Sequence, residues 1–123
     1  MAVLIRTGKV LVQERYRSTK GMVFEFPGGS VDLNETGEQA AIRELKEETG
    51  LRSVSVLGIH TLVNEFGGDI HYVILEQTEQ EEPKVVEAYR KQIFHWFHPA
   101  SIPRQDFYKA DILFIENQLI KYT

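Results

Sequence analysis

Hydrophobic and polar residues alternate near the start of the chain in the manner typical of β-strands. The pattern predicts strands over residues 2–6 and 9–13, joined by a Thr-Gly dipeptide that suits a tight hairpin. A basic loop is expected over residues 15–20. A short strand over residues 22–26 then leads into a glycine-rich turn.

The second half of the chain repeats this strand-rich pattern and ends differently. Residues 53–66 are rich in Val, Leu and Ile and predict a long or bent strand. A Gly-Gly-Asp turn separates it from a partner strand over residues 70–77, and an acidic loop follows over residues 76–84. Residues 93–97 predict a further strand, and residues 108–121 an amphipathic helix.

Between these halves lies a segment with strong helix signals. Thr36 followed by Gln39 fits a capping box, and Gly50 stands where a left-handed C-terminal cap is expected. Good helix formers fill the interval. At about 100° per residue, one stripe of this helix suits burial. Its members are Ala41, Ile42, Leu45 and Thr49.

The same helix carries a cluster of acidic residues away from that stripe. Glu44, Glu47 and Glu48 fall within an arc of about 100°, with Arg43 at its edge. Such like-charge neighbours each cost about 0.2–0.5 kcal/mol in an isolated helix. Lys46 points to a different face and cannot relieve all of this repulsion. A solvated acidic surface is one interpretation, and a bound divalent cation is the other.

Strands with two intervening helices predict an α/β fold in which a mixed β-sheet is sandwiched between helices, as a single domain over residues 1–123. The net charge of −4 argues against binding to a nucleic-acid backbone. The chain has no cysteine, which fits a reducing cytoplasm. Arg6 and Lys9 interrupt the first apolar run, so neither a signal peptide nor a membrane span is expected.

Residues 29–51 follow one fixed pattern, G-x5-E-x7-R-E-(aliphatic)-x-E-E-x-G-(aliphatic). A Phe-Pro-Gly-Gly turn over residues 26–29 precedes the helix. This segment resembles the signature of the Nudix hydrolases, a loop-helix-loop that binds metal and cleaves nucleoside diphosphates linked to another moiety. The resemblance extends to the nucleotide-sanitising, mutator-type members. Relatives usually carry several residues before the first strand, so either this member is minimal or its start lies late.

The resemblance implies a metal site made of hard oxygen ligands, which suit Mg²⁺ or Mn²⁺. Glu44 and Glu48 would bind the metal directly, together with the carbonyl of Gly29. Glu47 would be a further ligand or the general base that deprotonates water. Glu44, Glu47 and Arg43 form the expected catalytic set.

Arg43 is expected mainly to brace the glutamates, with Glu35 as its partner. A further metal ligand is expected from an acidic residue beyond the signature segment. Glu87 is the first choice because it precedes the strand that contains Trp96 by an interval similar to that in the family. The other candidates are Glu79, Glu81 and Glu82.

The resemblance also indicates substrate-binding positions. Arg15 lies where nucleotide-sanitising relatives contact phosphate. Phe26 and either Gln105 or Asp106 lie where such relatives read a base. The leading substrate is therefore a nucleoside triphosphate, intact or damaged. A nucleotide sugar or another nucleoside diphosphate derivative is the alternative.

The expected protein is a Nudix-type pyrophosphohydrolase that acts on a small nucleotide as a monomer or a homodimer. One rival is a non-catalytic Nudix-fold module that binds a nucleotide for regulation. Such modules generally lose glutamates of the signature segment, and this chain keeps them all. Another rival is an isomerase on the same fold, which would need a cysteine that the chain lacks.

Overall fold

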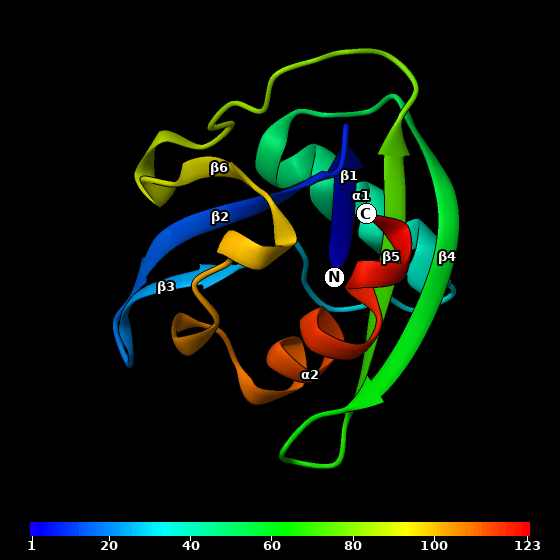
Figure 1. The fold of residues 1–123 in the computed structure, drawn as a ribbon. Coiled ribbons are helices and arrows are strands. Elements are labelled where there is room, and N and C mark those ends of the chain that lie inside the picture. Colours follow the sequence, from blue (N-terminus) through cyan, green and yellow to red (C-terminus); the bar gives the residue numbers. More distant parts are fainter.

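The computed structural model describes residues 1–123, apart from the side chain of residue 89. Six strands form one sheet in the order β3-β2-β1-β5-β4, and β6 pairs with β2 (Figure 1). The strands are β1 (Ala2–Arg6), β2 (Lys9–Arg17), β3 (Gly21–Glu25), β4 (Val54–Val63), β5 (Asp69–Gln77) and β6 (Ile93–Phe97). The helices are α1 (Gly37–Thr49) and α2 (Lys109–Asn117), with short 3₁₀ turns η1 (Ala88–Arg90), η2 (Pro99–Ser101), η3 (Arg104–Asp106) and η4 (Leu119–Tyr122).

The sheet is mixed, as predicted. β1 and β5 run parallel, with Ala2 opposite Val73, whereas the other pairs are antiparallel. The crossover between the hairpin of β1 and β2 and the later hairpin of β4 and β5 carries α1 (Figure 1). Since α1 covers one face and α2 the other, the expected sheet between helices is confirmed.

Each face of the sheet has its own apolar core. Alternate residues of the strands point to opposite faces, so neighbouring positions in one strand enter different cores. The α1 side contains Ala2, Leu4, Leu11, Ala41, Leu45, Leu51, Val73 and Leu75. The α2 side contains Val3, Ile5, Val10, Val12, Phe26, Tyr72, Ile74, Ile102, Phe107, Phe114, Ile115 and Leu119.

The signals at the ends of α1 are confirmed in detail. The Thr36 hydroxyl accepts from the amide of Gln39 at 3.1 Å, and the Gln39 side chain accepts from the Thr36 amide at 2.9 Å. Gly50 takes the left-handed conformation with φ of 79° and donates to the carbonyl of Lys46. Two ordered ends fix the length of α1 and therefore the rotation of its acidic side.

Two sequence predictions need correction. β2 continues to Arg17, because residues 15–17 pair with residues 21–23 of β3, and the expected basic loop is therefore shorter. The C-terminal helix ends at Asn117 and continues as η4. No helix among the described residues is long and apolar enough to cross a membrane.

Candidate functional site

The glycine turn lies directly against the acidic side of α1. A Cβ atom added to Gly29 would lie 2.6 Å from Oε1 of Glu44, so a side chain there would displace the Glu44 carboxylate. The amide of Gly28 donates to Oε2 of Glu48 at 2.7 Å. The backbone of this turn therefore lies close to both carboxylates, and on its other side a Cβ at Gly28 would lie 2.9 Å from the Cα of Met1.

Glu48 is the buried carboxylate of the cluster, with 2% of its surface exposed. It accepts from the Gln13 amide at 3.0 Å, and the guanidinium groups of Arg90 and Arg15 lie 3.6 and 4.0 Å away. Burial raises the pKa of the Glu48 carboxyl above its usual range, and the charge of Glu44 raises it further, against the hydrogen bonds from Gln13 and Gly28. The pKa of Glu48 is therefore raised even though Arg90 and Arg15 lie within 4.0 Å of it.

Arg43 links the remaining glutamates of the signature segment. It donates to both oxygens of Glu35 at 2.8 and 3.0 Å, and to Glu44 and Glu47 at 2.9 and 3.2 Å. Its second terminal nitrogen also donates to the carbonyl of Ser30 at 3.0 Å. These contacts lower the pKa of Glu35 and raise that of Arg43, each chiefly through their mutual hydrogen bonds.

The three helix glutamates differ in environment. Glu48 is buried, Glu44 is mostly covered, and Glu47 has 51% of its side chain exposed. Among the described residues, no three His, Asp or Glu side chains already converge into a metal-binding cluster. Arg43 holds Glu44, whereas Gln13 and the Gly28 amide hold Glu48.

The donor chemistry of this place nevertheless fits a divalent cation. Glu44 and Glu48 present hard carboxylate oxygens, and the charge of Glu44 contributes to the raised pKa of Glu48. The backbone at Gly29 lies in contact with Glu44. A cation bound by these groups would add positive charge between the two carboxylates, beyond that of the arginines near Glu48.

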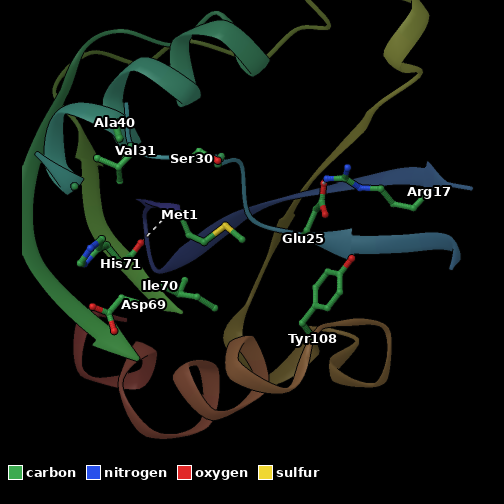
Figure 2. A pocket seen from close by; sticks show the side chains of 14 residues that line it. Met1, Arg17, Glu25, Ser30, Val31, Ala40, Asp69, Ile70, His71 and Tyr108 are labelled. Carbon is green, nitrogen blue, oxygen red and sulfur yellow. Dashed lines mark hydrogen bonds and ion pairs between the residues drawn. The ribbon is translucent and has the colours of Figure 1, made fainter. Parts of the chain in front are cut away.

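A cavity of about 640 Å³ opens beside the glycine turn (Figure 2). Gly28 and Gly29 line one wall, and Arg17 and Glu25 line another. Figure 2 shows Tyr108 across the cavity from the segment that carries Ser30. The cavity thus connects the acidic helix to an arginine and to the start of α2.

A smaller cavity of about 320 Å³ adjoins the first, since Ile70 and Tyr108 line both. Phe66 and the buried Asp111 complete its walls. Asp111 Oδ1 accepts from the hydroxyl of Tyr72, whereas Oδ2 is buried and has no hydrogen-bond partner among the described groups. Burial raises the pKa of Asp111 to about 6.

Two arginines on the same face of β2 reach the site differently. Arg15 has 19% of its side chain exposed and lies 3.7 Å from Glu25, within the protein. Arg17 has 43% exposed, donates to Glu25 at 2.9 Å and lines the large cavity. The arginine that faces the open cavity is therefore Arg17, whereas the sequence prediction named Arg15.

The other expected substrate-binding residues lie at different depths. Phe26 is buried in the aromatic core against Phe107 and Phe114, so it offers no open face to a substrate. Asp106 and Gln105 are exposed and line a small hollow outside the two cavities. The hollow adjoins the two cavities through Tyr108, which lines all three, so Gln105 and Asp106 lie near the expected substrate site without lining it.

The acidic residues outside the signature segment are dispersed. Glu87 lies 3.1 Å from the Arg90 guanidinium, and Arg90 in turn lies 3.6 Å from Glu48. One arginine therefore stands between Glu87 and the glutamates of α1. Glu82 pairs with Arg6, the last residue of β1, at 2.9 Å.

Sequence reasoning missed several polar residues of the site. Gln13 is fully buried and donates to both Glu25 and Glu48, and its carbonyl accepts from Gln92. The available signal was strand alternation, because Leu11 lies in the α1-side core and every second residue after it, Arg17 included, faces the same side. No sequence signal pointed to Asp111, which the α2 packing buries.

The fold and the site define a mixed α/β protein in which a glycine turn and an acidic helix border a polar cavity. The NUDIX domain family matches residues 1–118. An oxidized purine nucleoside triphosphate hydrolase of Danio rerio is 31% identical over 126 residues, which cover 98% of this chain and 78% of that relative. The chain belongs to the Nudix hydrolase family, and the resemblance inferred from the signature segment is confirmed.

Two further similarities agree with this family. An 8-oxo-dGTP diphosphatase of Proteus vulgaris is 39% identical over 56 residues, which cover 46% of this chain. The match spans 50% of the length of that relative. The crystal structure of a MutT NUDIX hydrolase from Burkholderia pseudomallei has a TM-score of 0.69 and 28% identity, covering 95% of this chain and 93% of its own.

Proposed function

We propose that this protein is a metal-dependent hydrolase that cleaves a phosphoanhydride bond of a nucleoside triphosphate, intact or damaged, by means of activated water. The single observation that supports this most is the placement of Glu44 and Glu48 against the Gly28-Gly29 turn, which itself lines the large cavity. Burial raises the pKa of Glu48 although Arg90 and Arg15 lie 3.6 and 4.0 Å away, and a bound cation would further stabilise its charged form.

Each residue of the site has a distinct proposed role. Glu44, Glu48 and the carbonyl of Gly29 would hold Mg²⁺ or Mn²⁺. Such a metal would neutralise the charge of the phosphates and lower the pKa of a bound water. Glu47 would accept the proton of the attacking water, because it is the most exposed of the three helix glutamates and is held only from one side, by Arg43. Arg43 holds these carboxylates in place against the loop, because it donates to Glu44, to Glu47 and to the Ser30 carbonyl.

The two adjoining cavities support a nucleoside as the group beyond the phosphates. The large cavity carries charged groups, whereas Phe66, Ile70 and Tyr108 give the small cavity an aromatic and aliphatic wall that suits a planar ring. The unpartnered Oδ2 of Asp111 would accept from the edge of that ring. The relatives that act on oxidized purine nucleoside triphosphates and 8-oxo-dGTP agree with this substrate class.

The test is a panel of nucleoside triphosphates, oxidised and intact, with nucleotide sugars and dinucleotides, assayed for phosphate and pyrophosphate release with and without Mg²⁺ or Mn²⁺. We expect turnover only with metal, and fastest with a nucleoside triphosphate. Nucleotide binding without turnover of any substrate would favour the non-catalytic module instead.

Arg17 provides a second test of this assignment. Because its guanidinium lines the cavity, we propose that it donates to a substrate phosphate, and Arg17→Ala is expected to raise KM by about ten-fold or more with a smaller change in kcat. Steady-state kinetics on the best substrate measures this. Lys9→Ala, at the exposed far end of β2, is the matched control and should leave KM unchanged. An unchanged KM for Arg17→Ala would remove Arg17 from the binding site.

A further inference from the structure

β4 is the edge of the sheet that lies beside β5, and no described strand pairs with its outer side (Figure 1). It is ten residues long, from Val54 to Val63. The outer row of its backbone amides and carbonyls is therefore available to another strand.

The composition of this edge favours pairing. The ten residues include no charged residue and no proline, which are the usual devices that prevent an edge from associating. Four large apolar side chains of the strand are more than a third exposed, namely Val56, Leu57, Ile59 and Val63. Leu113 of α2, which lines a surface hollow together with Val63, extends this apolar surface.

We propose that β4 pairs in antiparallel orientation with β4 of a second copy of this chain, across a two-fold axis, so that the two sheets become continuous. An antiparallel pair of identical strands is self-complementary, as a closed dimer requires. The register of this pairing is determined by the backbone directions and by the flanking charges.

The backbone directions follow from the contacts at the two ends of β4. The Ser53 carbonyl accepts from Thr78 and the Asn64 amide donates to Gly68, so both residues point toward β5. Backbone groups alternate in direction from these two points, with an interruption at the bulge between Val56 and Gly58, so that five residues point their backbone groups away from β5. They are Val54, Val56, Ile59, Thr61 and Val63.

One register pairs these outward residues with each other over the whole strand. When β4 overlaps its copy completely, Val54 lies opposite Val63 and Val56 lies opposite Thr61. Ile59 then lies opposite Ile59 of the second copy, on the two-fold axis. The single-residue bulge makes this agreement possible, because it shifts the alternation between the two halves.

The same register brings opposite charges together at both ends. Arg52 then lies opposite Glu65 of the second copy, and the symmetry repeats the pair. Both residues are exposed, and neither has an ion pair in the described part of the chain. This charge complementarity favours a second copy of this chain over an unrelated strand as the occupant.

The experiment is sedimentation of the full chain from about 1 to about 100 µM. We expect a concentration-dependent dimer. Val63→Lys places a charge on the edge and should weaken dimerisation more than ten-fold. Val85→Lys, on an exposed valine outside β4, is the control and should leave it unchanged. A monomer over the whole range, or a dimer insensitive to Val63→Lys, would overturn the proposal.

The register has its own test in a charge exchange. Arg52→Glu and Glu65→Arg should each weaken the dimer about ten-fold, since each replaces two attractive pairs by repulsive ones. The double variant should return to within about three-fold of the original affinity. If the double variant is as weak as the single ones, Arg52 does not face Glu65 and this pairing is wrong. Circular dichroism verifies that each variant keeps its fold.

Discussion

Glu48→Gln is expected to lower metal-dependent turnover by more than 100-fold while the protein stays folded. Loss of a group that only orients a metal ligand already costs about 10–100-fold, and Glu48 is proposed as a ligand itself. The fold survives because glutamine keeps the size of the side chain and one carbonyl acceptor for the Gln13 or Gly28 donor. The change in unfolding free energy should be under about 2 kcal/mol.

Two companion variants separate the roles within the helix. Glu47→Gln should also lower kcat strongly but leave Mn²⁺ affinity closer to that of the original protein, because Glu47 is proposed as the proton acceptor. Glu38→Gln, an exposed glutamate in the first turn of α1, should change neither. Mn²⁺ titration by calorimetry and steady-state kinetics measure the two quantities. Full activity of Glu48→Gln would refute the proposed metal site, whatever the substrate.

Asp111→Asn is expected to change the pH dependence of stability. The unfolding free energy of the variant minus that of the original protein should be roughly 2–3 kcal/mol more favourable at pH 7.5 than at pH 4. The pKa of Asp111 is about 6 in the folded protein because the carboxyl is buried, against 3.8 for an exposed aspartate. Between these values the folded protein binds more protons than the unfolded chain, so the contribution of Asp111 to stability falls as the pH rises. Asparagine carries no charge and loses this dependence.

Urea unfolding at several pH values measures this difference. Glu116→Gln, on the exposed side of the same helix, is the control and should track the original protein. Tyr72→Phe removes the hydroxyl that lowers the pKa of Asp111, so the loss of stability should then extend to higher pH. If the difference in unfolding free energy between Asp111→Asn and the original protein is the same from pH 4 to 7.5, the pKa of Asp111 is not raised in the folded protein.

Much of the site could be predicted from sequence because it is local. The capping box of Thr36 and the left-handed Gly50 lie within a few residues of the helix ends that they fix, and short-range hydrogen bonds decide them. The pairing of Arg43 with Glu35 joins residues eight apart, and the segment that holds both is continuous. The crowding of Glu44, Glu47 and Glu48 could be predicted for the same reason, since these residues lie within four positions of each other on one helix.

Other parts could not be read because they depend on contacts between distant segments. Arg15 and Arg17 lie on the same face of one strand, and only the packing around them makes one internal and the other accessible. Phe26 follows the strand directly and looked like a substrate contact, but the packing of α2 places it in the aromatic core. Asp111 carries no motif, and its burial comes from the sheet on which α2 packs.

The sequence by itself determined the family, the acidic helix and its caps, because these depend on residue types at fixed short spacings. The tertiary structure alone decided which carboxylate is buried and which arginine faces the cavity. It also decided that β4 is left as an uncharged edge. Desolvation, cavity shape and strand order arise only when segments far apart in the chain come together, and no local pattern encodes them.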